Sequence, residues 1–489
     1  MPSPALFVAL SLAAPPKVIE ADVCVYGGTS GGVVAAVQAA RMGKTVVIAE
    51  PGGHLGGMTS GGLSAVDIGD PRTVGGVARE YFTRLVGRYG HELAWNEPFK
   101  AVGGGPATGG AYSIEPHVAE GVFNEMVRAA KVPVHLAARL AKATKDGPRL
   151  REFVTDDGTT FRAKVFIDAT YEGDLMAAAG VSYATGREAN AEHDETLNGV
   201  ARKWQTHGHR FLKPVDPFVK PGDKASGLLF GVEPELPPDG TADKRLQAYC
   251  FRMCMCQDPA NRVPFPKPAD YDEAKYELLF RNFEAGDARL PLKIDPAPNG
   301  KTDTNNNGAV STDFIGQNYA YPEASYADRE KIVAAHATYQ QGLMWALANH
   351  PRVPQAVRDR MAKWGLAKDE FTDSGHWPHQ LYVREARRLA PDYVMTERDC
   401  RRLRDTPESV GMGSYGMDSH NCARYVTPDG KVQNEGDVQE GTGGPYRIAY
   451  RAIVPKKGEC PNLLVPVCVG STHIAYGSIR MEPVFMILG

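Results

Sequence analysis

The feature that most constrains this fold is the stretch VYGGTSGGVVAAVQAARMGKTVVIAEPGG at residues 25–53. Residues 21–28 have the apolar character of a short buried parallel strand, and residues 31–42 predict a helix rich in small side chains. A second buried strand is predicted at residues 45–50, with Glu50 at its carboxyl end. A strand, a glycine-rich turn, a helix, a strand and an acid in this order form a βαβ unit that binds a dinucleotide.

The turn departs from the G-x-G-x-x-G fingerprint, because Thr29 stands where the second glycine is expected. Gly27 can supply the tight bend and Gly32 the close packing of helix on strand, while the Thr29 hydroxyl can donate to a phosphate oxygen. The turn alone fits a glycine-rich loop of another α/β protein equally well. Glu50 favours a dinucleotide, because its carboxylate can accept from both ribose hydroxyls. The predicted contacts of the turn are Gly27, Gly28, Thr29, Ser30, Gly31 and Gly32.

A second glycine cluster, GGHLGGMTSGGLSAVDIG, covers residues 52–69. Each glycine loses much backbone entropy on ordering, so a purely structural loop gains little from so many of them. Close approach of the backbone to a bulky flat ligand explains them better and favours FAD over a nicotinamide cofactor. His54 in this cluster could carry a covalent flavin bond, but a hydrogen bond to the cofactor or a role in loop structure is favoured.

These blocks, followed by FIDATYEGDLMAAAG, GRE, NNNGAVSTDFIG, LYVREARRL, GSYGMDSHNC and STHIAYGSIRMEPVFMILG, resemble the FAD-dependent oxidoreductase family of glutathione-reductase-like flavoproteins, often labelled xanthan-lyase-related. The resemblance covers nearly all of the chain after about residue 22. It implies bound FAD and redox chemistry without a defined substrate, and threonine is frequent at the second glycine position. Such proteins usually continue a helix beyond the M-x-L-G element, so we expect truncation at Gly489. The implied cofactor contacts beyond the turn are Glu50, Gly56, Gly57, Met58, Asp168, Ala169, Thr170 and Asp174.

A chain of 489 residues exceeds what one hydrophobic core usually supports. We predict an α/β fold with a three-layer FAD-binding Rossmann-like domain of the glutathione-reductase type and an inserted α+β substrate or cap domain. Short alternating segments from residue 132, broken at residues 146–147 and 157–158, predict a β-meander before a returning strand. The predicted parts are a signal peptide or disordered start at residues 1–20, the first part of the FAD domain at 21–190, the cap domain at 191–440, and a return to the FAD domain at 441–489, strand-like over residues 462–489.

Candidate catalytic groups lie in two blocks near the expected flavin. In GSYGMDSHNC, Tyr415, Asp418 and His420 lie close together, and His420 is the preferred base with Asp418 orienting it. In STHIAYGSIRMEP, His473 is a second candidate, and Arg480 can stabilise reduced flavin or a substrate carboxylate. A hydrogen-bonded structural role for His420 and a paired interior position for Arg480 remain open alternatives.

Three further patterns carry weaker expectations. LYVREARRL predicts a helix at residues 381–389 with a solvated or salt-bridged arginine face, and binding of a substrate anion is the alternative. DTNNNGAV begins like a calcium loop at Asp303, but Phe314 stands where a bidentate Glu is required, which excludes an EF-hand and leaves an isolated oxygen-ligand site open. The eight cysteines lack a paired C-x-x-C and a histidine at finger spacing, so no metal centre is expected.

Net charge and hydropathy indicate which kinds of binding partner and which cellular location to expect. A net charge of −3 gives no large field for nucleic acid, so a small-molecule substrate is expected, with an unknown electron acceptor. The apolar run at residues 5–14 predicts export through a weak signal, with a cytoplasmic location as the alternative because no Lys or Arg precedes it. No apolar stretch reaches the length of a membrane span.

The sequence therefore predicts an FAD-dependent oxidoreductase that transfers a hydride between flavin and a small organic substrate, such as a sugar, a polyol or another alcohol. A carbohydrate-processing lyase or carbohydrate-binding protein with a structural or vestigial flavin site is the alternative. A flavin enzyme reduced by NADH is less favoured, because no second βαβ nucleotide unit is visible after residue 188.

Overall fold

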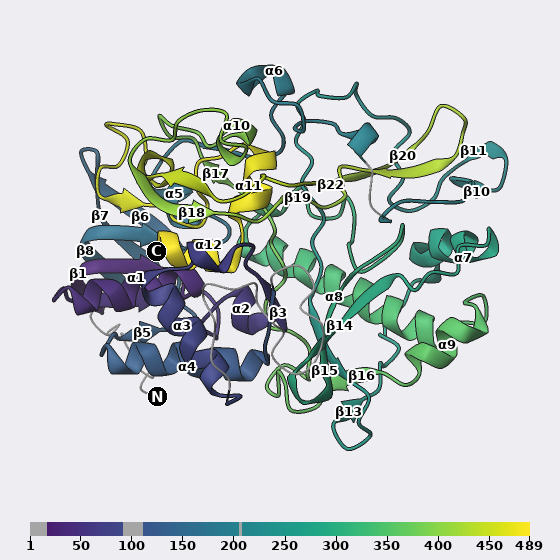
Figure 1. Cartoon of the computed structure of the whole chain (residues 1–489), viewed down its shortest axis with the longest axis horizontal. Coiled ribbons are helices and arrows are strands. Elements are labelled where there is room, and N and C mark those ends of the chain that lie inside the picture. The colour runs from purple at the N-terminus through teal and green to yellow at the C-terminus, as the bar shows by residue number, and fades with distance from the viewer. Residues whose placement is uncertain (1–16, 91–110, 205–207) are drawn as a thin grey trace, which may run out of the picture.

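The computed structural model describes residues 17–90, 111–204 and 208–489, so the apolar run at residues 5–14 lies outside the described residues. The fold is mixed α/β. A large sheet with its helices occupies one side, and a smaller antiparallel sheet with the long helix α8 (Tyr326–Asn349) occupies the other (Figure 1). The predicted fold class is confirmed.

The large sheet has seven strands in the order β5-β2-β1-β8-β7-β6, with β24 beside β8. Strands β1, β2, β5, β8 and β24 run parallel, and β6, β7 and β8 form an antiparallel meander, as predicted. The strands are β1 (Val18–Tyr26), β2 (Val46–Ala49), β5 (Val134–His135), β6 (Leu140–Asp146), β7 (Arg149–Thr155), β8 (Thr160–Asp168) and β24 (Leu463–Leu464). The helices of this half are α1 (Ser30–Arg41), α2 (Met58–Gly61), α3 (Gly76–Gly87), α4 (Pro116–Ala129), α5 (Asp174–Ala178), α11 (His473–Ile479) and α12 (Glu482–Leu488).

The carboxyl ends of three parallel strands meet at one edge of this sheet. Tyr26, the last residue of β1, pairs with Ala49 of β2 and with Asp168 of β8. The residues that follow each strand therefore emerge side by side. Along β1, Cys24 and Tyr26 belong to one hydrophobic cluster and Val25 to another, because successive side chains point to opposite faces. Both faces are covered, as is usual for parallel strands.

The C-terminal segment joins this half of the molecule, and half of residues 462–489 lie in the helices α11 and α12, so the strand-like expectation is wrong outside β24. The local signals are helical: Thr472 caps α11 by accepting from Ala475 N–H, and Pro483 lies in the first turn of α12. Helix α12 packs on α1, so the C-terminal helix lies against the first helix of the chain (Figure 1). A Cβ at Gly31 would lie 2.8 Å from the Phe485 carbonyl oxygen, so the glycine permits this close approach.

The middle of the chain forms a five-stranded antiparallel sheet in the order β13-β16-β12-β15-β14. Its strands are β12 (Met253–Cys256), β13 (Arg262–Val263), β14 (Leu292–Ala297), β15 (Lys301–Asn306) and β16 (Gly365–Ala367), and its helices are α7 (Glu277–Glu284), α8 and α9 (Gln355–Met361). Asp303, the first residue of the calcium-like motif, lies in β15, where its buried carboxylate pairs with Arg252. The described cysteines are free and buried.

Short strand pairs and two short helices complete the described fold. The pairs are β3 (Ala65–Asp67) with β4 (Ala111–Ser113), β9 (Tyr183–Ala184) with β17 (Arg388–Leu389), β10 (Phe218–Lys220) with β11 (Asp223–Leu228), β18 (Ser409–Gly413) with β23 (Tyr446–Ala449), β19 (Met417–Ser419) with β22 (Val438–Glu440), and β20 (Ala423–Val426) with β21 (Val432–Glu435). The short helices are α6 (Asn190–His193) and α10 (Glu397–Cys400). None of the described helices is both long and apolar enough to span a lipid bilayer.

The predicted helix at residues 381–389 is wrong. The segment is irregular up to β17 and contains no helix. Its arginines are buried and salt-bridged, so the salt-bridged alternative is confirmed and the solvated face is wrong. Arg384, Arg387 and Arg388 pair with Asp313, Asp174 and Glu188, respectively. Carboxylates from distant segments thus decide the conformation, and local charge spacing cannot reveal them.

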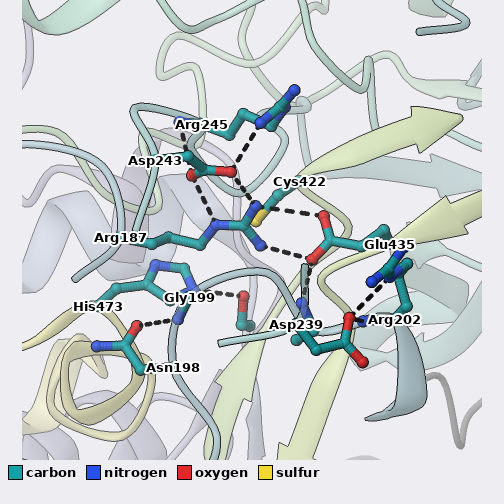
Figure 2. A network of polar contacts seen from close by, with 12 residues as sticks. Arg187, Asn198, Gly199, Arg202, Asp239, Asp243, Arg245, Cys422, Glu435 and His473 are labelled. Atoms are coloured by element: carbon teal, nitrogen blue, oxygen red, sulfur yellow. Dashed lines mark hydrogen bonds and ion pairs between the residues drawn. The ribbon is translucent and has the colours of Figure 1, made fainter. Parts of the chain in front are cut away.

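A buried ion-pair network ties the middle of the chain to its C-terminal part (Figure 2). The fully buried Arg187 donates to Asp243 Oδ2 at 2.6 Å and to Glu435 Oε1 at 2.7 Å. Asp243 also pairs with Arg245 at 2.8 Å. At the rim of the same network, the partly exposed Arg202 pairs with Asp239 at 2.8 Å.

Candidate functional site

A cavity of about 610 Å³ lies at the edge where β1, β2 and β8 end. Gly27 and Thr29 of the turn, Glu50 after β2 and Thr170 after β8 line it. Its opposite wall comes from α8 and from the turn at residues 374–380. Sites for cofactors and small ligands typically measure about 300–1,000 Å³, so the cavity has the size of a ligand site.

The turn between β1 and α1 holds its shape through two glycines and Thr29. Gly27 has φ +100°, a backbone conformation that residues with a side chain rarely adopt. A Cβ at Gly32 would collide with the Gly27 carbonyl oxygen. The Thr29 hydroxyl donates to the Ala169 carbonyl at 2.7 Å and accepts from Gly32 N–H at 3.3 Å. Its proton is therefore used inside the protein, unlike the expected donation to a phosphate. The N–H groups in the first turn of α1 remain the donors that face an anion at this end.

Glu50 lies at the end of β2 and lines the cavity. Its carboxylate accepts from Gly28 N–H and from Gly52 N–H, each at 2.5 Å. Burial raises the pKa of Glu50 to about 7. Each carboxylate oxygen can accept a second hydrogen bond, so Glu50 can still receive hydroxyl donors from a ligand.

The second glycine cluster wraps this turn. Gly56 N–H donates to the Gly28 carbonyl at 2.7 Å, and Gly56 and Gly57 both have positive φ. Met58 begins α2, and its N–H donates to the Tyr171 hydroxyl at 2.8 Å. Gly57 and Gly61 line the cavity, which therefore extends from Glu50 to α2.

A buried carboxylate joins the elements around the turn. Glu482, the first residue of α12, accepts from the hydroxyls of Ser30, Thr59 and Tyr171 at 2.6, 2.8 and 2.7 Å. Burial raises the pKa of Glu482. Glu482 thereby connects α1, α2, the segment after β8 and α12. Reasoning from the sequence missed it, although an acid within the apolar run MEPVFMILG is a visible signal.

Of the predicted cofactor contacts at the end of β8 and just after it, some fix the turn and others line the cavity. Asp168 does not line the cavity; its carboxylate accepts from Thr170 N–H at 3.1 Å and from Met176 N–H at 2.8 Å, which fixes the turn. Burial raises the pKa of Asp168 to about 6. Thr170 and Asp174 do line the cavity, and Asp174 is held by Arg329 at 2.6 Å.

A second group of polar side chains, away from the lining of the cavity, is buried around His420. His420 Nδ1 lies 2.8 Å from Asp313 Oδ2, whereas its Nε2 lies 4.0 Å from Asp418 Oδ2. Asp313, and not Asp418, therefore holds the ring of His420. Arg384 lies 3.1 Å from Asp313 on the other side. Against the effect of burial, Arg384 and His420 keep the pKa of Asp313 below its usual range, while burial and Arg384 lower the pKa of His420.

Asp418 faces Arg480. Arg480 donates to the Asp418 carbonyl at 3.0 Å and to the Tyr382 hydroxyl at 2.9 Å, and its guanidinium lies 3.4 Å from Asp418 Oδ2. Asp67 of β3 lies near Asp418, and burial raises the pKa of Asp67 to about 6. Tyr415 belongs to the same group, because Asp67, burial and Asp418 raise the pKa of its hydroxyl. None of Asp67, Tyr415 and Asp418 lines the cavity.

Several buried atoms of this cluster lack hydrogen bonds within the described residues. They are Asp418 Oδ1, Asp437 Oδ2, Arg480 Nε and Arg252 Nε. Burial and the nearby Asp418 raise the pKa of Asp437 to about 8, so its carboxyl is largely protonated at neutral pH. Buried polar atoms are normally paired, so unpaired ones of both signs indicate a place for a polar ligand.

His473 lies outside this cluster. Its Nδ1 is 2.6 Å from Glu385 Oε2 and its Nε2 is 3.0 Å from Ser419 Oγ, so both ring nitrogens are engaged in the interior. The structure thus groups Tyr415, Asp418, His420 and Arg480, and it separates His473 from them. Asp313 and Asp437 join the cluster from segments that the sequence analysis did not single out as catalytic; the only sequence signal was that NNNGAVSTDFIG contains Asp313.

The residues of the cavity fit an extended dinucleotide. Side chains are excluded where a pyrophosphate must approach the backbone, because Cβ atoms at Gly27 and Gly32 would strike the neighbouring backbone. The amino end of α1 offers N–H groups to an anion, and Glu50 offers acceptors to hydroxyls at the end of β2.

The chain matches the model of one known protein family. The model of the family described as FAD dependent oxidoreductase matches residues 22–489. A search of curated proteins gives no match.

Solved structures show only distant likeness. A flavin monooxygenase mutant from Stenotrophomonas maltophilia is 17% identical, with 35% of this chain and 41% of that chain covered and a TM-score of 0.21. A 3-ketosteroid-delta4-(5alpha)-dehydrogenase from Rhodococcus jostii RHA1 is 18% identical, with 35% and 50% covered and a TM-score of 0.22. The anhydrotetracycline hydroxylase OxyS from Streptomyces rimosus is 8% identical, with 39% and 41% covered and a TM-score of 0.27. The matches span half or less of those chains, and likeness at this level carries no argument about substrate.

Proposed function

This chain belongs to the FAD dependent oxidoreductase family, and we propose that it transfers a hydride between a small organic substrate bearing a hydroxyl group and its FAD. The observation that carries the proposal is the buried cluster of His420, Asp313, Asp418 and Arg480. It combines a held base with unpaired polar atoms that can receive a hydroxyl group.

The cavity residues divide the work of holding FAD. The N–H groups at the start of α1 and the bare backbone of Gly27 would receive the pyrophosphate. Glu50 would accept from the adenosine ribose, and Gly57 and Gly61 leave room for the flavin end. Bound FAD supplies the group that accepts or gives the hydride.

His420 acts as the base. Oxidation of an alcohol removes a hydride from carbon and a proton from oxygen, so a neutral acceptor must stand at the oxygen. With Nδ1–H donated to Asp313, the lone pair of His420 is on Nε2, whose nearest ionic partner among the described residues is Asp418 at 4.0 Å. Nε2 takes the hydroxyl proton, and the Asp313 carboxylate stabilises the imidazolium that forms.

The remaining groups position the substrate. Asp418 Oδ1 can accept from a second hydroxyl, and Arg480 Nε can donate to a substrate oxygen. Asp437 in its protonated form can also donate. Several donors and acceptors in one buried site favour a polyhydroxylated substrate, such as a sugar or polyol, over an apolar alcohol.

An anaerobic screen tests this proposal. The natively purified protein is mixed with sugars, polyols, simple alcohols, amines and hydroxy acids while flavin absorbance is followed. We expect bleaching by at least one polyhydroxylated compound and none by amines. Protein that carries no FAD after native purification would contradict the proposal. Polysaccharide cleavage that persists after FAD is removed would instead support the carbohydrate lyase.

A further inference from the structure

Beyond this redox function, a group of three side chains at the rim of the cavity has the composition of a metal site. We propose that His54, His379 and Asp373 bind a divalent transition-metal ion, with Zn²⁺ as the representative ion. Their ligand atoms all lie within 4.8 Å of one another. His54 follows β2 in the glycine cluster, and the other two residues lie in the turn after β16, so the site joins the two halves of the molecule.

The distances match the spacing of metal ligands. His54 Nε2 lies 3.2 Å from Asp373 Oδ2, and His379 Nε2 lies 3.5 Å from Asp373 Oδ1. Ligand atoms about 2.05 Å from a tetrahedral Zn²⁺ are about 3.3 Å apart. Both pairs fall within about 0.2 Å of that separation, each through a different oxygen of the Asp373 carboxylate. Two imidazoles and one carboxylate form a ligand set that suits Zn²⁺ and its neighbours in the first transition row.

The other ring nitrogens are already held. His54 Nδ1 lies 3.0 Å from Glu120 Oε1, and His379 Nδ1 lies 3.3 Å from Ser374 Oγ. Metal-binding histidines characteristically engage their second nitrogen in this way, which sets the tautomer that leaves the other nitrogen free for a metal. The two rings stack with centroids 3.5 Å apart and an interplanar angle of 13°, so binding of one ion requires one imidazole to turn until both Nε2 lone pairs point to the same place. Phe371 packs edge-on against His379 at 5.0 Å.

A second cluster of similar composition differs, because a lysine already lies where an ion would bind. Glu115, His117 and Glu370 also lie close enough to share an ion. There, however, the ammonium of Lys301 contacts Glu115 at 2.7 Å and Glu370 at 2.6 Å. A cation of the protein already occupies the place of a metal, so this cluster is a buried ion-pair group. The described contacts place no lysine or arginine against Asp373.

The site has three protein ligands, as catalytic zinc sites do. Three protein ligands leave one tetrahedral position for water or for an anionic oxygen. His54 and His379 both line the cofactor cavity, whereas Asp373 does not. Asp373 is also the most exposed of the three, with 60% of its side chain accessible. Its substitution therefore tests the metal site with little effect on the cavity or on folding.

The test measures zinc binding by the holoprotein after treatment with EDTA and dialysis. Competition with a chromophoric chelator gives stoichiometry and affinity for wild type, Asp373→Asn, Glu120→Gln and His117→Gln. We expect one Zn²⁺ per wild-type chain, at least 100-fold weaker binding for Asp373→Asn, and about 10-fold weaker binding for Glu120→Gln. His117→Gln, from the cluster filled by Lys301, should bind like wild type.

Two outcomes would overturn the proposal. One is a wild-type chain that takes up no zinc; the other is equal affinity in wild type and Asp373→Asn. Thermal unfolding gives an independent reading, because a ligand that binds only the folded state raises the melting temperature. Zn²⁺ should raise the melting temperature of wild type and His117→Gln and leave that of Asp373→Asn unchanged.

Discussion

Thr29 and Gly32 show why the turn after β1 tolerates one departure from the fingerprint and not another. The Thr29 hydroxyl bonds to the Ala169 carbonyl and to Gly32 N–H, so its removal costs one or two ordinary hydrogen bonds. Thr29→Gly should lose about 1 kcal/mol of unfolding free energy and retain FAD. Gly32→Val should lose FAD, because its Cβ would collide with the Gly27 carbonyl. Flavin absorbance per chain after gel filtration measures both, and FAD retention by Gly32→Val would contradict the packing argument.

His420 carries a prediction about rate. If its Nε2 takes the substrate proton, His420→Gln should lower kcat/KM by about 10²–10⁴-fold while FAD stays bound. His193→Gln is the matched control, since that partly exposed ring on α6 lies outside the cluster. Steady-state kinetics with the substrate found by the anaerobic screen measure the effect. Equal loss in both variants would remove His420 from the mechanism.

The same histidine sets a pH dependence. Burial and Arg384 lower the pKa of His420, so the neutral ring persists below the usual value of about 6.5. The acidic limb of kcat/KM should therefore lie below pH 6.5. Asp313→Asn removes the charge that favours the imidazolium and should move this limb lower still. His420 also makes the free energy of unfolding depend on pH. Its ring takes up a proton near pH 6.5 in the unfolded chain and only at lower pH in the folded chain, so it lowers stability as pH falls below 6.5.

At the scale of elements, Glu482 decides how α12 sits on α1 and α2. Three hydroxyls donate to its carboxylate, and each would lose a buried acceptor in Glu482→Ala. An unsatisfied buried group costs about 1–3 kcal/mol, so we expect a loss of at least about 2 kcal/mol and weaker FAD retention. Glu482→Gln keeps an acceptor oxygen and should lose less. Urea denaturation compares them, and equal stability of the two variants would exclude the hydrogen bonds as the cause.

At the scale of the whole molecule, the network around Arg187 holds the middle of the chain against its C-terminal part (Figure 2). Arg187→Ala leaves Asp243 and Glu435 buried without this cation, which should cost about 3–5 kcal/mol of unfolding free energy. Arg202→Ala removes a partly exposed pair of the same network and should cost less than about 1 kcal/mol. Chemical denaturation measures both, and equal losses would show that burial of Arg187 carries no special weight.

Sequence and structure agree most where interactions are local. The βαβ unit, the meander breaks at residues 146–147 and 157–158, and Glu50 at the end of β2 were predictable, because periodicity and turn residues act over a few positions. The prediction failed at residues 381–389 and at most of residues 462–489. The first segment is not helical, and its arginines pair with carboxylates far along the chain. The second is helical because caps and packing on α1 outweigh its apolar, strand-like composition.

The sequence by itself determined the cofactor half of this protein: its fold class, its FAD and the residues of the first turn. Only the tertiary structure decided which partner each buried charge has. Asp313 lies more than 100 residues from His420 and holds its ring, and Asp373 approaches His54 across two halves of the fold. A local pattern fixes backbone shape through contacts between near neighbours. The chemistry of a site depends on distances between side chains that only the packed chain brings together.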